Sequence, residues 1–232
     1  MTAYAIEPPP QASIPVAGTD RVFAVHRIYC VGRNYVEHAK EMGFTGREPP
    51  FFFMKPADAV VPVGEGSTGR MPYPMHTSDL HHEIELVVAI GKRGANIAAA
   101  DAMHYVWGYA VGLDMTRRDL QTEAKNKGRP WEVGKAFDHS APIGPLHPIA
   151  ATGTIDAGEI RLDVNGKARQ SSDIGKLIWN VAETIEHLSS LFELQPGDLI
   201  FTGTPEGVAK VERGDVMEGR IAGLGSLRVE VA

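Results

Sequence analysis

Two acidic residues, Glu83 and Glu85, stand two positions apart at the start of an apolar run over residues 86–90. The β-branched, apolar character of this run predicts a buried strand. Because residues two apart on a strand point to the same face, the two carboxylates are expected to project side by side. Such a pair is unfavourable next to a core unless a cation lies between the two groups, and a hard divalent metal ion fits that role. The spacing alone also allows an alternative, in which the two glutamates form the solvent-facing side of an ordinary half-exposed strand.

A third carboxylate, that of Asp114, follows the apolar run Val106–Leu113. Three oxygen ligands leave about three of six octahedral positions for water and substrate, as Mg²⁺ or Mn²⁺ prefers. Three carboxylates and a divalent ion still sum to one negative charge, which would repel an anionic substrate. Lys55, Arg118 and Lys135 can supply the surrounding cations that such a substrate requires.

Two neighbouring histidines, His81 and His82, raise the alternative of a zinc site. Successive residues of a strand face opposite sides, so both imidazoles cannot join the same carboxylates. This geometry disfavours a mixed zinc centre.

His38 and Glu41 have the form of an oriented general base. The segment 35–42 predicts a helix that ends at Gly43, and residues three apart share a helix face. A carboxylate beside an imidazole fixes its tautomer and raises its basicity, so His38 could deprotonate water. The alternative is a surface pair on an exposed helix.

Covalent catalysis is disfavoured by the sequence. We find no Gly-x-Ser-x-Gly elbow, and the single cysteine, Cys30, sits in an apolar run typical of a buried structural thiol. Attack by a metal-assisted water is favoured instead.

The elements that must position these residues are mostly strands. Gly 25 and Pro 16 in 232 residues favour many turns and short strands. Strands are predicted at 51–55, 106–113 and 199–202, with a hairpin over 160–170 that turns at Asn165-Gly166. Shorter helices are expected over 98–105, from 116–119 to 127, and after Asn180. Asn180 and Glu183 form a capping-box pattern ahead of an apolar face made of Val181, Ile185, Leu188, Leu191 and Phe192.

One glycine pattern, G-x-G-x-x-G over residues 64–69, would support a dinucleotide-dependent oxidoreductase if a helix began inside it. Pro72 and Pro74 follow at once and exclude such a helix. We therefore predict a turn there, and residues 130–138 are predicted to be irregular.

Bulk properties exclude several function classes. The net charge of −6 shows no basic face for nucleic acid, and no apolar run approaches the ~18 residues of a membrane span. A single cysteine suits a reducing compartment, and the N-terminus lacks a signal-peptide pattern, so a cytoplasmic protein is expected. We expect a loose Pro- and Ala-rich arm over residues 1–20 and a single catalytic domain over 21–232.

Several short motifs, in order over about residues 23–231, together resemble the fumarylacetoacetate hydrolase family and, within it, its acylpyruvate hydrolase branch. They are Cys30-Val31-Gly32-Arg33-Asn34-Tyr35 with His38 and Glu41; Phe53-Met54-Lys55-Pro56; His82-Glu83-Ile84-Glu85-Leu86; Leu113-Asp114-Met115-Thr116-Arg117-Arg118-Asp119; Lys135-Ala136-Phe137; and Thr202-Gly203-Thr204-Pro205-Glu206-Gly207-Val208.

The resemblance implies an α+β, mostly β fold: a mixed β-sandwich rolled into a partial barrel with short peripheral helices. It implies a homodimer and a Mg²⁺ or Mn²⁺ ion held by Glu83, Glu85 and Asp114. It also implies that His38 and Glu41 act as the catalytic dyad, and that Lys135 is catalytic. Substrate contacts are expected from Lys55, Arg118, Gln121 and Thr204, with Thr204 touching the substrate carboxylate.

The activity implied by the resemblance is metal-dependent hydrolysis of a C–C bond in an acylpyruvate, a small anionic keto acid from aromatic catabolism such as the gentisate pathway. The expected substrate is fumarylpyruvate, cleaved to fumarate and pyruvate. Relatives that decarboxylate oxaloacetate, or that isomerise or hydrate enolic dicarboxylates, define the alternative. Those reactions use the same metal enolate, and decarboxylation needs no water-activating base.

Overall fold

The larger sheet joins segments that lie far apart in the chain. The computed structural model of the protein describes residues 3–37 and 47–232, and within these ranges the sheet has eight strands. In spatial order they are β4 (Phe51–Lys55), β3 (Ile28–Gly32), β15 (Leu199–Phe201), β8 (Ile84–Ile90), β9 (Val106–Leu113), β11 (Ala141–Ile143) and β5 (Val60–Pro62), with β12 (His147–Pro148) also paired to β9. The sheet is mixed, because β15–β3 and β11–β5 are parallel and the other pairs are antiparallel.

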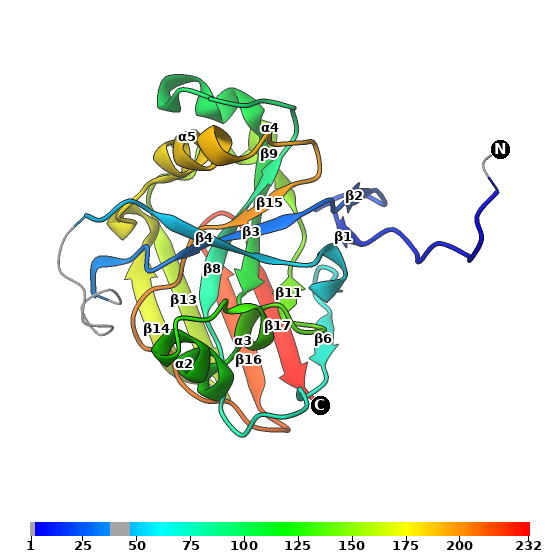
Figure 1. Ribbon diagram of the computed structural model, residues 1–232, viewed down its shortest axis with the longest axis vertical. Helices are drawn as coiled ribbons and strands as arrows, with labels where there is room; N and C mark the ends of the chain where they lie inside the picture. The colour runs from blue at the N-terminus through cyan, green and yellow to red at the C-terminus, as the bar shows by residue number, and fades with distance from the viewer. Residues whose placement is uncertain (1–2, 38–46) are drawn as a thin grey trace.

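A second, smaller sheet packs against β8 and β9 (Figure 1). Its strands are β14 (Lys167–Asp173), β13 (Glu159–Val164), β16 (Val216–Ile221), β17 (Ser226–Val231) and β6 (Thr68–Met71). Together the two sheets form the curled, mostly β half-barrel that the sequence led us to expect. Two short ribbons complete the strands described: β1 (Ser13–Pro15) with β2 (Val22–Ala24), and β7 (Leu80–His81) with β10 (Thr116–Arg117).

Short helices cover the outside of the sheets, as expected. In Figure 1, α2 and α3 lie toward the lower end of the molecule and α4 and α5 toward the upper end; α2 and α3 contact each other and β10, and α3 also contacts β4 of the larger sheet. The helices are α2 (Arg118–Asn126), α3 (Glu132–Lys135), α4 (Ile149–Thr152) and α5 (Val181–Leu191), with 3-10 turns η1 (Ala57–Ala59), η2 (Ala99–Tyr105) and η3 (Ile174–Lys176). No helix within the described ranges is both long and apolar enough to cross a membrane.

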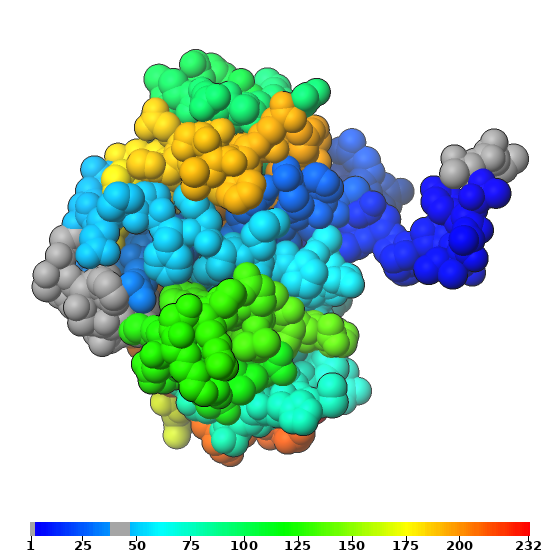
Figure 2. All heavy atoms as spheres, in the orientation of Figure 1, coloured from blue at the N-terminus to red at the C-terminus, as the bar shows by residue number. Residues whose placement is uncertain are grey.

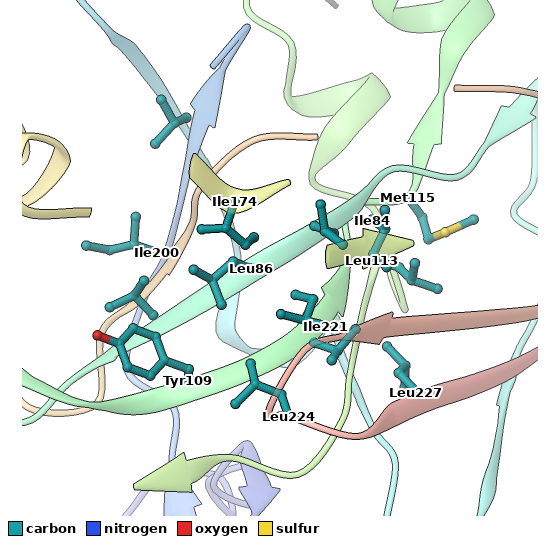
Figure 3. Close-up of a cluster of buried hydrophobic side chains, with 14 of the residues drawn as sticks. Ile84, Leu86, Tyr109, Leu113, Met115, Ile174, Ile200, Ile221, Leu224 and Leu227 are labelled. Atoms are coloured by element: carbon teal, nitrogen blue, oxygen red, sulfur yellow. The ribbon is translucent and has the colours of Figure 1, made fainter. Parts of the chain in front are cut away.

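Strand β8 is buried on both faces, which explains its nearly continuous apolar sequence. Leu86 and Val88 belong to one hydrophobic cluster, and Val87 and Ala89 belong to another on the opposite face. Figure 3 shows the first cluster, in which residues of the larger sheet face residues of the smaller sheet. Labelled members include Ile84, Leu86, Leu113, Ile221 and Leu227.

Two local predictions that depend on short-range chemistry are confirmed. Asn165 and Gly166 have φ of 51° and 74° and turn the hairpin between β13 and β14. Asn180 accepts from the backbone N–H of Glu183, while the Glu183 side chain accepts from the backbone N–H of Asn180, which completes the capping box of α5.

The glycine pattern at 64–69 is a turn that leads into β6, and no helix begins there. The structural requirement for a dinucleotide site is therefore missing at this position.

Three expectations differ from the structure. Residues 1–20 are not loose throughout, because β1 pairs with β2 and Ile14 is fully buried; Figure 2 shows residues 3–12 extending away from the body. Residues 130–138 include the helical turn α3. The apolar face of α5 stops early, since Leu191 is 65% exposed and Phe192 37% exposed. The helix expected over 35–42 lies largely outside the described residues.

Candidate active site

Three carboxylates meet at one end of the β8–β9 pair because of the register between the strands. Ile84 lies opposite Leu113, so Asp114 lies opposite Glu83, and the Asp114 N–H donates to the Glu83 carbonyl oxygen at 2.8 Å. Residues directly opposite in an antiparallel pair share a face, and Glu85 shares that face with Glu83. One ligand oxygen from each of the three residues lies within 4.8 Å of the others, and all three residues are buried.

Glu85 is almost completely buried and depends on a loop from a distant segment. The backbone N–H of Gly203 donates to its Oε2 at 2.7 Å. Burial, then the neighbouring carboxylates of Asp114 and Glu83, raise the pKa of Glu85 well above its usual range, and the charge of Lys135 and the Gly203 N–H only partly offset this. A buried carboxylate with a raised pKa is a site at which added positive charge is favourable.

Three cations contact the triad, each from a different element. Lys55, at the end of β4, lies 2.8 Å from Asp114 Oδ1. Lys135, at the end of α3, bridges Glu83 Oε2 at 2.7 Å and Asp114 Oδ2 at 2.6 Å. Arg118, the first residue of α2, donates from Nη2 to Glu83 Oε1. The structure therefore brings together the carboxylates and the cations that the sequence singled out.

Lys135 stays charged in this setting although it is fully buried. Burial by itself would lower its pKa, but Asp114 and Glu83 outweigh that effect, so the pKa is raised. Its main chain also holds a second cation, because Lys55 Nζ donates to the Lys135 carbonyl oxygen.

The donor set fits a hard divalent cation. The three groups are oxygen ligands, they converge, and they are buried where unneutralised negative charge is costly. Mg²⁺ and Mn²⁺ favour such carboxylate sites, whereas the softer ligands of a zinc centre are not in this cluster of described residues.

The two histidines face different partners, which removes the zinc alternative. His81 lies 2.8 Å from Asp79 Oδ1 and accepts from Arg118 Nε at 3.4 Å. His82 lies 3.0 Å from Gln170 Oε1, and burial lowers the pKa of His82 to about 4, so it is neutral. Neither ring joins the carboxylate cluster.

Gln121 and Thr204 line the same small cavity as the triad. Gln121 Oε1 accepts from Arg118 Nη1. The Thr204 hydroxyl donates to the Ile84 carbonyl oxygen at 2.8 Å, which fixes its position beside the triad. Because that proton is already used, contact between the Thr204 side chain and a substrate carboxylate stays a prediction.

Gln170, a buried residue of β14, was not anticipated. Its Oε1 accepts from the Ile84 N–H at 3.1 Å, and its Nε2 donates to Thr204 Oγ1 and to the Pro205 carbonyl oxygen, both at 2.8 Å. It thus links the strand of the carboxylates to the 203–205 loop. The signal available in the sequence was its place at an inward-facing position of a predicted hairpin strand.

His38 and Glu41 lie outside the described residues, so their arrangement stays a prediction. Cys30 is fully buried, and burial raises the pKa of its thiol well above its usual range. A thiol in that state is a poor nucleophile, as the sequence indicated.

A curled, mostly β sheet that gathers three carboxylates and three cations at one end defines a class of proteins with an acidic metal centre. The chain matches the model described as fumarylacetoacetate (FAA) hydrolase C-terminal over residues 27–232. The protein belongs to the fumarylacetoacetate hydrolase family.

Several relatives carry specific names. The crystal structure of fumarylpyruvate hydrolase from Pseudomonas aeruginosa in complex with Mn²⁺ and pyruvate is 59% identical, covers 99% of each chain and superposes with a TM-score of 0.97. A fumarylpyruvate hydrolase from Ralstonia sp is 45% identical over 79% of this chain and 93% of its own. A mitochondrial oxaloacetate tautomerase from Mus musculus is 44% identical over 88% of this chain and 90% of its own.

Proposed function

We propose that the protein is a metal-dependent hydrolase that cleaves the C–C bond of an acylpyruvate, with fumarylpyruvate converted to fumarate and pyruvate. The observation that carries this proposal is the buried triad of Glu83, Glu85 and Asp114, surrounded by cations and suited to Mg²⁺ or Mn²⁺. The 59% identical fumarylpyruvate hydrolase, whose structure holds Mn²⁺ and pyruvate, supports it.

The charge balance of the site favours an anionic substrate. The three carboxylates are matched by Lys55, Lys135 and Arg118, so these six groups sum to zero. A divalent ion held by the triad adds two positive charges. That excess suits a keto acid whose carboxylate and developing enolate carry two negative charges.

The ion would act as a Lewis acid that stabilises negative charge on the keto-acid end of the substrate. We propose that His38, oriented by Glu41, takes a proton from water. The resulting hydroxide adds to the distal carbonyl carbon, and Lys135 or Gln121 donates to the oxyanion that forms there. The C–C bond then breaks, the acyl carbon leaves as a carboxylic acid, and the departing carbon of pyruvate takes up a proton.

The direct test follows the enol absorbance of fumarylpyruvate with purified protein, with a chelator, and with Mg²⁺ or Mn²⁺ restored. We expect metal-dependent loss of absorbance with fumarate and pyruvate released in equal amounts. Asp114→Asn should lose this activity, whereas Asp215→Asn, a matched change at a carboxylate outside the site, should keep it. Absorbance loss that is insensitive to the chelator would contradict the proposal.

The dyad is tested separately by His38→Ala. We expect this variant to bind Mn²⁺ as the wild type does and to lose hydrolysis by about 10²–10⁴-fold, the usual contribution of a general base. Full hydrolytic activity in His38→Ala would remove the dyad from the mechanism and leave the metal site untouched.

A second candidate function is tautomerisation or decarboxylation of oxaloacetate, favoured by the 44% identical mouse oxaloacetate tautomerase. These reactions use the same metal-stabilised enolate and need no attack by water. His38→Ala would then retain decarboxylation, and oxaloacetate would replace fumarylpyruvate as the better substrate. Comparing both substrates on wild type and His38→Ala separates the two functions.

We also propose a homodimer in the cytoplasm that acts in aromatic catabolism, such as the gentisate pathway. Light scattering at micromolar concentration measures the assembly, and a molar mass of one chain would contradict it.

A further inference from the structure

Arg33 has an unusual backbone conformation directly beside the site. It follows Gly32 at the end of β3 and has φ of 59°, in the left-handed region that side-chain-bearing residues seldom adopt. Such positions are usually glycine, and a non-glycine residue there often reflects a function of its side chain.

The Arg33 guanidinium lies against two aromatic rings at the wall of the cavity. Its Cζ is 5.2 Å from the centroid of Phe51 and 5.8 Å from that of Trp131. Gly32 makes room for this arrangement, because a Cβ there would lie 2.0 Å from Cζ of the Phe51 ring. Arg33 and Trp131 line the same cavity as the carboxylate triad. The rings therefore hold a cation at the edge of the site.

The backbone next to Arg33 is firmly anchored. Asn34 is fully buried, donates to the Thr202 carbonyl oxygen at 2.7 Å, and accepts from the Trp179 N–H at 2.8 Å. A cation on an anchored backbone is preorganised for binding an anion.

A row of aromatic rings separates Arg33 from the cations of the metal site. Lys135 Nζ lies 5.1 Å from the Phe53 centroid, and the Phe53 and Trp131 centroids are 5.8 Å apart. Trp131 then contacts Arg33 at the far end of the row. The Phe53 and Trp131 rings are tilted by 52° to each other and form an apolar wall between the two cations. This order matches an elongated molecule that is apolar in the middle and anionic at both ends.

We propose that Arg33 binds the carboxylate at the acyl end of the substrate, so that the site selects acylpyruvates that terminate in a carboxylate over those with a neutral acyl group. This inference rests on the proposed acylpyruvate hydrolase function and names the substrate class of that site. A guanidinium offers two parallel N–H donors to a carboxylate, and the acyl chain packs against the Phe53 and Trp131 rings.

The nearby carboxylate of Glu48 does not remove this role. Partial burial lowers the pKa of Arg33, the charge of Glu48 raises it, and a guanidinium stays protonated at neutral pH. Glu48 is exposed, so solvent screens its interaction with Arg33. The carboxylate of a substrate that the site holds at both ends can therefore displace Glu48 from Arg33.

The test compares two substrates of the Mn²⁺-loaded enzyme: fumarylpyruvate, and acetylpyruvate, which has a methyl group in place of the chain with the terminal carboxylate. Arg33→Met removes the charge and keeps an unbranched side chain. Arg33→Lys keeps the charge but lacks the two parallel N–H donors of the guanidinium. We expect Arg33→Met to lower kcat/KM for fumarylpyruvate by about 10- to 100-fold, mainly through KM, the range for a hydrogen bond to a charged group. Its kcat/KM for acetylpyruvate should change by less than about 3-fold, and Arg33→Lys should lie between wild type and Arg33→Met.

Arg213→Met is the matched control, because Arg213 also lies over an aromatic ring, 4.4 Å from the Tyr73 centroid, and lies outside the cavity lining. Arg213→Met should leave kcat/KM for both substrates unchanged. A second readout is inhibition by fumarate with acetylpyruvate as the reporter substrate; Arg33→Met should raise the fumarate inhibition constant by the same factor as its loss on fumarylpyruvate.

Equal loss on both substrates in Arg33→Met would show that Arg33 only braces the aromatic rings, and would overturn the inference. Wild-type kcat/KM for both substrates in Arg33→Met would also overturn it, with the hydrolase function still standing. Wild-type enzyme that hydrolyses neither substrate would instead overturn the proposed function, and the inference with it.

Discussion

Lys135 is the one of the three cations that contacts both Glu83 and Asp114, and so it helps to stabilise the carboxylate cluster without a metal ion. Its ammonium lies within 2.7 Å of one oxygen of Glu83 and one of Asp114, and it is almost completely buried. Removing one partner of a buried ion pair leaves charge with neither water nor a counterion. Lys135 is therefore important for stability as well as for the proposed chemistry.

We predict that Lys135→Met lowers the free energy of unfolding by about 3–5 kcal/mol in the presence of a chelator, the usual effect of breaking a buried pair. Saturating Mn²⁺ should recover part of this loss, because the ion supplies the missing positive charge between Glu83 and Asp114. Urea unfolding under both conditions measures the two values. Lys127→Met, which removes an exposed partner of Glu123, is the control and should be neutral. Equal loss with and without Mn²⁺ would contradict the argument.

Gln170 carries a second prediction at this scale. Gln170→Leu leaves Thr204, the Pro205 carbonyl oxygen and the Ile84 N–H without their buried partner, which should cost about 1–3 kcal/mol for each group left unsatisfied. We also expect lower activity, because the 203–205 loop loses its tie to β14. Thermal unfolding and kcat measure the two effects, with Ser171→Ala, an exposed neighbour, as control. Wild-type stability in Gln170→Leu would contradict the linking role of Gln170.

Spacing and strand periodicity predicted how the carboxylates of the site are arranged, whereas Lys55, Arg118 and Lys135 were named only because such carboxylates need surrounding cations. Glu83 and Glu85 share a face because they are two apart, and Asp114 follows from its place at a strand end. Gln170 could not be predicted in the same way, since its partners lie up to 88 residues away and a glutamine in a hairpin has no local signature. Arg33 could not be predicted either, because no pattern in the sequence indicates its left-handed backbone conformation.

At the scale of elements, the 203–205 loop is the connection that completes the site. It leaves β15, places the Gly203 N–H on Glu85, and places Thr204 on Ile84. Gly203 has φ of 101°, and a Cβ there would lie 2.7 Å from the Asn34 Cβ. The loop can follow this path only with glycine at that position.

We predict that Gly203→Ala destabilises the protein by about 2–4 kcal/mol, from backbone strain and overpacking together, and weakens Mn²⁺ binding because the N–H to Glu85 moves. Gly223→Ala separates the two causes, since Gly223 also has positive φ but nothing within 4 Å of its Cβ position. It should lose only about 1–2 kcal/mol and keep its Mn²⁺ affinity. Equal Mn²⁺ affinities in the two variants would contradict the role of the loop.

The prediction of helices and turns was right where residues close in sequence determine the structure. It was wrong where tertiary packing determines which residues are buried. The capping box of α5 and the Asn165-Gly166 turn depend on neighbours in sequence. Leu191 continues the apolar spacing of α5 and is nonetheless exposed, because the helix ends there. The turn α3, which holds Lys135, follows Trp131 without a capping side chain, so its sequence gives no start signal.

For the whole molecule, sheet order was beyond the periodicity of the sequence. β15 pairs in parallel with β3, Leu199 opposite Ile28, across most of the chain. Arg27 and His26 reinforce the contact through the buried Asp198. Such non-local pairings leave no local trace, so the partial barrel could be expected only from the resemblance to a family.

The assembled site also sets a conflict between stability and function. Glu85, Glu83 and Asp114 converge from two strands, and burial with mutual repulsion raises the pKa of Glu85. A charge that is unfavourable in the metal-free protein is useful only when an ion binds. Replacing Glu85 by its neutral amide should therefore leave the metal-free protein at least as stable as the wild type.

Binding of the ion should stabilise the whole fold by mass action, because the unfolded chain has no assembled triad. At Mn²⁺ concentrations 100-fold above the dissociation constant, the free energy of unfolding of the wild type should rise by about 2.7 kcal/mol relative to chelator. Glu85→Gln should lose most of that rise while matching or exceeding wild type in chelator. Glu218→Gln, a change at an exposed carboxylate of β16, should respond to Mn²⁺ as the wild type does. Urea unfolding at fixed protein concentration measures all three. A Mn²⁺ response in Glu85→Gln equal to that of the wild type would show that the ion binds elsewhere.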